Sequence, residues 1–147
     1  MPDTGLDIFD KAVQKSNEWL NELGHNESIG PDHQRAYHAL RAVLWTLRDR
    51  LTVEEAFHLS SQLPLLLRGM FWDGYRPGDK PEKMKTPDEF LGRVQERLAQ
   101  MNGPNADQAT RAVFELLVHH IPEGEMAHVR QMMPKPLESY LGQRAAH

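Results

Sequence analysis

The sequence predicts an all-α protein, an internally duplicated helical bundle in which two copies of a four-helix unit pack around a pseudo-twofold axis. Apolar residues recur at three- and four-residue steps, which indicates amphipathic helices. No segment alternates with a period of two, and β-branched residues are sparse, so we expect no strand. The segment that begins RAVLWTL at Arg41 recurs, degraded but ungapped, as RAVFELL from Arg111. Self-similarity of this kind is typical of a repeat architecture.

The repeat extends over most of the chain. At an offset of 70 residues, the comparison superposes Ala39 on Ala109, Val43 on Val113, Leu47 on Leu117, Glu55 on Glu125, His58 on His128, Pro64 on Pro134 and Leu67 on Leu137. We therefore expect a single domain over residues 1–147, with a first repeat at about 7–71, a linker at 72–86 and a second repeat at about 87–141. Neither repeat can cover its apolar faces alone, so the two must pack together.

The first repeat is expected to hold helices at about 7–23, at about 31–50, from about 53 to the proline at 64, and at about 64–71. Pro31 follows a polar loop and suits the first residue of the second helix. That helix carries the cleanest 3.6-residue apolar stripe in the chain, so it must face the core. Thr52 and Glu55 form a capping box that starts the third helix. Pro64 ends the third helix because proline lacks an N–H and clashes with the preceding turn.

The second repeat follows a linker, WDGYRPGDKPEKMK, that mixes Gly, Pro and charge without periodicity. Thr86, Pro87 and Glu89 then give a cap, a first-turn proline and a reciprocal acid, which predict a helix start. Helices are expected at about 87–101, from the Gly-Pro pair at 103–104 to about 120, at about 123–132 and at about 134–141. When the helix at about 87–101 is compared with the helix at about 7–23 at an offset of 81 residues, Phe90, Val94 and Gln95 match Phe9, Val13 and Gln14.

Composition narrows the class of protein. Seventeen Lys and Arg against 21 Asp and Glu give a net charge of −4, which argues against a nucleic-acid partner. The absence of cysteine excludes disulfides and thiolate metal sites, and it fits a cytoplasmic location. The acidic N-terminal segment does not read as a signal peptide. The longest apolar run, at 63–67, is far shorter than the roughly 20 residues that span a bilayer, so we expect no membrane partner.

A family resemblance lies in the segments LRAVLWTLRDRLTVEEAF, SQLPLLLRGMFWDGY, EFLGRV, RAVFELL and GEMAHVRQMMP. Together they resemble a bacterial family described as domain of unknown function 2267. The similarity covers nearly the whole chain, from Phe9 to about Leu141. It implies an all-helical, internally duplicated domain, often a stand-alone soluble protein, with a loose link to stress-related genes. Since it brings no established catalytic residues, it assigns no catalytic, cofactor-binding or metal site to this chain.

One duplicated motif has a sharper chemical interpretation. Glu55 with His58, and Glu125 with His128, form Glu-x-x-His motifs at matching positions, and di-iron carboxylate bundles use two such motifs. The alternative function is therefore a metal- or small-molecule-binding protein, or an enzyme, that uses these four residues in a groove between the repeats. Against it, Glu55 already serves the capping box, and the helical wheel turns His58 away from the core. No glutamate on the other helices is duplicated, so we expect neither metal nor another cofactor.

Two further polar features have ordinary explanations. His119 and His120, like Arg48 and Arg50, are cations at a helix C-terminus, where the helix dipole favours positive charge. The helices on either side of the turn at 51 superficially resemble a helix-turn-helix motif. The second of them opens with two acids where a recognition helix would meet DNA, so we expect no DNA binding.

The favoured function is a non-enzymatic interaction or accessory module that binds a protein partner or self-associates as a homo-oligomer. Its expected contact surface is the junction between the repeats, where Arg68, Phe71, Trp72 and Tyr75 lie around a turn-forming Asp-Gly pair. The end of the second repeat offers no matching aromatics, so the duplication varies this surface while it keeps the scaffold. The alternative is that Trp72 and Tyr75 fold back and pin the linker to the core.

Four residues are expected to have a structural role at the C-terminal end of the third helix of each repeat, namely Arg41, Pro64, Arg111 and Pro134. Antiparallel packing of the second and third helices would place Arg41 level with the carbonyls that Pro64 leaves without donors. Arg111 stands in the same relation to Pro134. We therefore expect each arginine to donate hydrogen bonds to these carbonyls, at 59–64 and 129–134.

Overall fold

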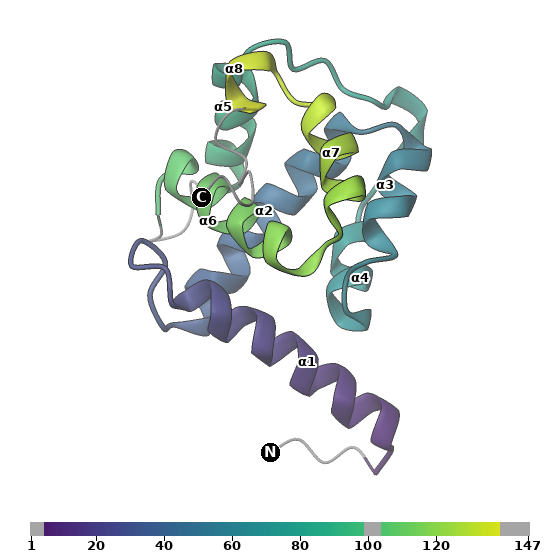
Figure 1. The fold of residues 1–147 in the computed structure, drawn as a ribbon, viewed down its shortest axis with the longest axis vertical. Coiled ribbons are helices and arrows are strands. Elements are labelled where there is room, and N and C mark those ends of the chain that lie inside the picture. Colours follow the sequence, from purple (N-terminus) through teal and green to yellow (C-terminus); the bar gives the residue numbers. More distant parts are fainter. Residues whose placement is uncertain (1–4, 99–103, 139–147) are drawn as a thin grey trace.

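The computed structural model describes residues 5–98 and 104–138, and the regular elements in these ranges are all helices (Figure 1). The all-α prediction is confirmed for these residues. The elements are α1 (Asp7–Gly24), α2 (His33–Arg50), α3 (Val53–Ser60), α4 (Leu65–Trp72), the 3₁₀ turn η1 (Pro77–Asp79), α5 (Pro87–Leu98), α6 (Ala106–His120), α7 (Glu123–Gln131) and α8 (Lys135–Glu138). The helix ends predicted at 101 and 141 lie outside the described residues.

Two of the predicted helix starts are built as the sequence indicates. The Thr52 hydroxyl accepts from the Glu55 N–H at 3.1 Å, and the Glu55 carboxylate accepts from the Thr52 N–H at 3.0 Å. Thr86 and Glu89 make the same reciprocal pair at the start of α5, at 3.1 and 3.0 Å. These bonds satisfy backbone N–H groups that the first turn of a helix leaves free.

Several helix boundaries differ from the prediction, and α6 begins at Ala106, after the N-cap Asn105, rather than at the Gly-Pro pair at 103–104. Helix α2 begins at His33 rather than at Pro31, because Asp32 acts as the N-cap and accepts from a backbone N–H of the first turn. Helix α3 ends at Ser60, and a short turn leads to Pro64, which stands at the N-cap of α4. The proline therefore separates two helices, as expected.

The core lies around α2 and α6. Helix α2 packs on α1, α4, α5 and α6, and α6 also packs on α1, α5 and α7. Helix α3 packs on α7, and α8 packs on α5. The residues of α2 and α6 that are fully buried include Ala36, Ala39, Leu40, Val43, Leu44, Leu47, Ala109, Val113, Phe114 and Leu117. None of the described helices is long and apolar enough to cross a bilayer.

Helix α1 lies along the outside of the molecule, and its N-terminal turns extend past the body of helices around α2 and α6 (Figure 1). It buries the residues Ala12, Ser16, Trp19 and Leu23, which are spaced by three or four positions. Ile8 and Phe9, in its first turn, are 64% and 50% exposed. The apolar stripe of α1 therefore extends beyond the surface that the described residues cover.

Candidate functional site

The aromatic residues predicted to form a contact surface are packed against their own chain. Phe71 is fully buried, so the expectation that it lies on a surface patch is wrong. The reason is that α4 turns Phe71 toward α2 and the core. Trp72 and Tyr75 are half-buried, and their rings meet edge to face at 4.9 Å between centroids. Arg68 is turned to the other end of α4 and lies outside this ring cluster.

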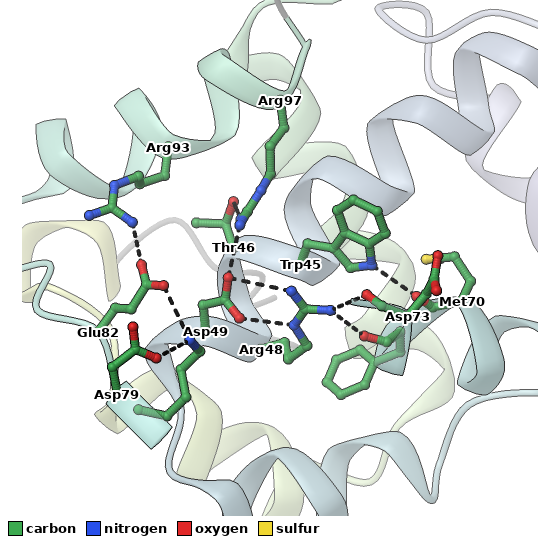
Figure 2. Close-up of polar contacts among 12 residues, drawn as sticks. Trp45, Thr46, Arg48, Asp49, Met70, Asp73, Asp79, Glu82, Arg93 and Arg97 are labelled. Carbon is green, nitrogen blue, oxygen red and sulfur yellow. Dashed lines mark hydrogen bonds and ion pairs between the residues drawn. The ribbon is translucent and has the colours of Figure 1, made fainter. Parts of the chain in front are cut away.

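Two side chains of α2 fix the end of α4 (Figure 2). The Trp45 indole N–H donates to the Met70 carbonyl at 2.8 Å. Nη1 of Arg48 donates to the carbonyls of Phe71 and Asp73, at 2.9 Å each. Carbonyls in the last turn of a helix lack donors within the helix, so these bonds supply them. Arg48 lies in the last turn of α2, as predicted, but it is only 4% exposed and also supplies donors to the end of α4.

Asp49 is the centre of a buried ionic network between α2 and α5 (Figure 2). Its Oδ1 accepts from Arg48 Nε at 2.9 Å, and its Oδ2 accepts from Arg97 Nη2 at 2.8 Å. Arg97 also donates to the Thr46 hydroxyl at 2.7 Å. Asp49 is 3% exposed, and a carboxylate so deeply buried must be ionically paired to be stable. We therefore interpret the network as a structural contact that holds α5 against α2, and not as a reactive site.

The linker is tied into the same network. The Glu82 N–H donates to the Asp49 carbonyl at 2.7 Å, and the Glu82 carboxylate pairs with Arg93. The Lys80 ammonium donates to Asp79 at 2.7 Å and to Glu82 at 3.3 Å. Burial by itself lowers the pKa of Lys80, but the hydrogen bonds to these carboxylates outweigh it and raise the pKa. The linker is thus held against α2 and α5, in line with the alternative that this region is pinned to the core.

The arginine that bonds the carbonyls before Pro64 is Arg68, so the prediction for Arg41 is wrong. Arg68 Nε donates to the Ser60 carbonyl at 3.2 Å, and its Nη2 donates to the Leu63 carbonyl at 3.0 Å. Arg41 instead lies over the ring of Trp45 at 5.2 Å and bonds His38. The physical reason is proximity, since a side chain in the first turn of α4 faces these carbonyls directly.

In the second half of the chain, Arg111 donates from Nε to the Asp107 carboxylate at 2.9 Å, one helical turn away. Pro134 is buried and immediately precedes α8, as Pro64 precedes α4.

The duplicated Glu-x-x-His motifs are not brought together as one set of ligands. Helices α3 and α7 do pack on each other, but His58 and His128 are both exposed. The Glu55 carboxylate is used by the capping box, and His58 lies 3.9 Å from the exposed Glu54. Within the described residues, the group of side chains with metal-ligand spacing lies elsewhere.

That group consists of Glu22, near the end of α1, and the adjacent His119 and His120 at the end of α6. Glu22 Oε2 lies 2.5 Å from His119 Nδ1, and Glu22 Oε1 lies 2.7 Å from His120 Nε2. Burial alone would raise the pKa of Glu22, but the hydrogen bonds from both histidines outweigh it and lower the pKa. The carboxylate is therefore ionised and accepts from both rings. Trp19 stacks on His120, with ring centroids 4.4 Å apart.

A cavity of about 280 Å³ opens beside this cluster, between α1 and α6. Its wall includes Glu22, His119, His25 and Glu115 together with Leu23, Asn26, Ala112 and Leu116. Sequence reasoning treated His119 and His120 as helix-end cations and missed the cluster. The only signal in the sequence was the pair of adjacent histidines, since the acid that meets them lies on a helix far away in the chain.

Among the residues that the structure describes, the exposed large apolar side chains fall into two groups. One group is at the start of α1, and it consists of Leu6, Ile8 and Phe9. The other is on α3 and α4, and it consists of Val53, Phe57, Leu65 and Leu66. Exposed apolar side chains that form a contiguous patch are a mark of a protein-protein contact.

Comparison with known proteins gives a family without an assigned activity. A family model described as "Uncharacterized conserved protein (DUF2267)" matches residues 16–140. No curated protein matches the chain.

Proposed function

Because the chain belongs to the DUF2267 family of uncharacterised conserved proteins, we infer its function from the structure and propose that it is a non-enzymatic interaction module. In this proposal the module self-associates through the N-terminal half of α1. The contact surface includes Leu6, Ile8 and Phe9, in place of the aromatic cluster around Trp72. A cytoplasmic setting belongs to the same proposal and fits a chain without cysteine.

The proposal includes the internal duplication, which the packing of the helices supports. Helix α1 packs on α2 as α5 packs on α6, and α1 packs on α4 as α5 packs on α8. Helix α1 also packs on α6 as α5 packs on α2. Three matched pairs of apolar residues on α2 and α6 are fully buried, namely Ala39 and Ala109, Val43 and Val113, and Leu47 and Leu117. This is the pattern that two copies of one unit around a pseudo-twofold axis would give.

One comparison between the two halves carries the proposal. Phe9 of α1 is 50% exposed, whereas Phe90, its counterpart in α5, is fully buried. Val13 is half-buried and its counterpart Val94 is fully buried. At this offset the two helices bury different faces, because the buried Ala12 and Ser16 of α1 match Arg93 and Arg97 of α5. The first half therefore leaves Phe9 exposed, although the residue that the sequence sets against it serves as core in the second half. Burying one such side chain contributes about 1.5–3 kcal/mol, which favours a partner that covers it.

A second copy of the chain is the partner that this surface fits. The stripe is a helix face built from the residue types of the protein's own core, and a twofold contact sets each stripe against its equivalent. Two α1 helices packed along their apolar faces would bury Phe9 from both chains without any further element. The resulting dimer would leave α3 and α4 free.

The test is the oligomeric state of the purified chain over a range of concentrations, measured by sedimentation velocity. We expect a reversible dimer whose dissociation constant rises at least about tenfold in Phe9→Glu, since each dimer then buries two carboxylates. Phe57→Glu is the matched control, because Phe57 is 63% exposed but lies on α3. A wild-type chain that stays monomeric at every concentration, or a dimer lost only in Phe57→Glu, would contradict the proposal.

A further inference from the structure

We propose that Glu22, His119 and His120 form a binding site for a divalent transition-metal ion, and that Zn²⁺ is the ion these ligands fit best. The site joins the C-terminal end of α1 to the C-terminal end of α6. It is separate from the Glu-x-x-His motifs of α3 and α7. It does not depend on the proposed self-association, because Phe9 lies in the first turn of α1 and Glu22 in its last.

The positions of the donor atoms suit a metal ion. One nitrogen of each histidine and one oxygen of Glu22 lie within 4.8 Å of one another. Tetrahedral Zn²⁺ holds its ligands at roughly 2.0–2.2 Å, so neighbouring ligand atoms are about 3.4 Å apart. The present separations of 2.5 and 2.7 Å between Glu22 and the two rings need to widen by less than about 1 Å. The side chain of His119 is 68% exposed, so it can make this adjustment freely.

The ligand chemistry selects the class of ion. Two imidazoles and one carboxylate suit Zn²⁺ and its first-row neighbours, whereas Mg²⁺ and Ca²⁺ prefer oxygen ligands. Each ring binds as a neutral imidazole with its proton on the nitrogen away from the ion, so the proton donated to Glu22 leaves the ligating nitrogen, either to the other ring nitrogen or to solvent, and the bond to Glu22 is exchanged for a bond to the ion. Three protein ligands leave a fourth tetrahedral position open. The cavity beside Glu22 and His119 has room for the water that would fill it.

Neighbouring groups hold these ligands in place. The Trp19 ring stacks on His120 with an interplanar angle of 20°, which fixes the orientation of that imidazole. The Glu22 carboxylate already faces both histidines, with its oxygens 2.5 and 2.7 Å from the two ring nitrogens, so the ligands converge before the ion binds. His25 and Glu115 line the same cavity, where they can hydrogen-bond the water and the outer edges of the site.

The alternative is that these three residues form only a surface ion pair, which in other proteins contributes little and binds nothing. The two can be separated by calorimetric titration of Zn²⁺ into the full chain, purified without a polyhistidine tag. We expect one ion per chain. Glu22→Gln keeps the shape of the side chain and should weaken binding more than about tenfold, and His119→Ala should do the same.

Matched controls are available on the same helix and in the other histidine motifs. Glu18→Gln changes an exposed carboxylate one turn earlier on α1, and His58→Ala removes an exposed histidine of α3. Both should bind Zn²⁺ as the wild type does, and so should Phe9→Glu. Zn²⁺ should also raise the melting temperature of the wild type and not that of His119→Ala, which is expected to fold because its side chain is exposed. Absence of binding to the wild type, or equal binding by Glu22→Gln and His119→Ala, would overturn the proposal.

Discussion

Arg97 of α5 donates a hydrogen bond from Nη2 to Asp49 of α2 at 2.8 Å, across the interface between two helices that belong to different halves of the chain. The same carboxylate accepts from Arg48, whose guanidinium also holds the end of α4. One buried acid therefore connects α2, α4 and α5. Removing it leaves a buried guanidinium without its counter-charge, which is more costly than losing a surface pair.

Replacement of Asp49 by alanine should consequently lower the free energy of unfolding by about 3–5 kcal/mol. Urea denaturation measures this directly. Asp107→Ala is the control, since Asp107 also pairs with an arginine at 2.9 Å but is about half exposed. Its loss should cost no more than about 1 kcal/mol. Equal effects of the two substitutions would contradict the role assigned to Asp49.

Arg68 offers a second stability test, because it replaces Arg41 as the donor to the turn before α4. Arg68→Met removes bonds to two carbonyls, of Ser60 and Leu63, and should cost about 1.5–3 kcal/mol in chemical denaturation. Arg41→Met should cost less, since Arg41 contacts aromatic rings and His38 and leaves no carbonyl unpaired. A larger loss of stability in Arg41→Met than in Arg68→Met would contradict this assignment and favour the arrangement predicted from the sequence.

The sequence predicts those features that are written in neighbouring residues. The capping box of Thr52 and Glu55, the break at Pro64 and the apolar stripe of α2 each depend on spacing within one or two helical turns. All three are in the structure as expected. The all-α class follows from the same local signals, because helical periodicity recurs in the segments on either side of the linker.

The features that sequence reasoning missed are contacts between distant side chains. Nothing in the sequence around Arg48 indicates that it reaches the carbonyls at the end of α4 rather than solvent. The arginine that bonds the turn is the nearer one in the chain, since Arg68 lies four residues after Pro64, whereas Arg41 lies 23 residues before it and contacts aromatic rings instead. Glu22 and His119 meet because α1 crosses the end of α6. Such pairings need the tertiary arrangement.

The Glu22 cluster predicts a dependence of stability on pH. Its folded pKa is lowered by the histidines despite partial burial, so its ion pairs contribute stability above the unfolded pKa of about 4.5, and this contribution is lost as the pH falls through the lowered pKa. Wild type should therefore exceed Glu22→Gln in stability at about pH 5, and the difference should disappear in stronger acid. Urea denaturation over a pH series measures this difference. Glu18→Gln is the control, and its difference from the wild type should stay small throughout.

The aromatic cluster at the end of α4 predicts effects on folding rather than on association. Trp72 meets Phe71 at 5.1 Å and Tyr75 at 4.9 Å between ring centroids, and each such pair contributes about 0.5–1.5 kcal/mol beyond its buried area. Trp72→Ala should therefore lower the free energy of unfolding by at least about 1 kcal/mol. Phe71→Ala should cost more, about 3–5 kcal/mol, because Phe71 is fully buried and its removal leaves a cavity.

Neither residue lies on α1, so sedimentation velocity should give Trp72→Ala the dimer dissociation constant of the wild type as long as the chain is folded. The reverse result, unchanged thermal stability with weakened association, would move the contact surface from Phe9 to the junction between the halves. The pKa of the Tyr75 hydroxyl gives an independent test of the two outcomes. Burial raises the pKa of its hydroxyl in the isolated chain, so a spectrophotometric titration that gives an ordinary value would mean that the cluster is open to solvent and free for a partner.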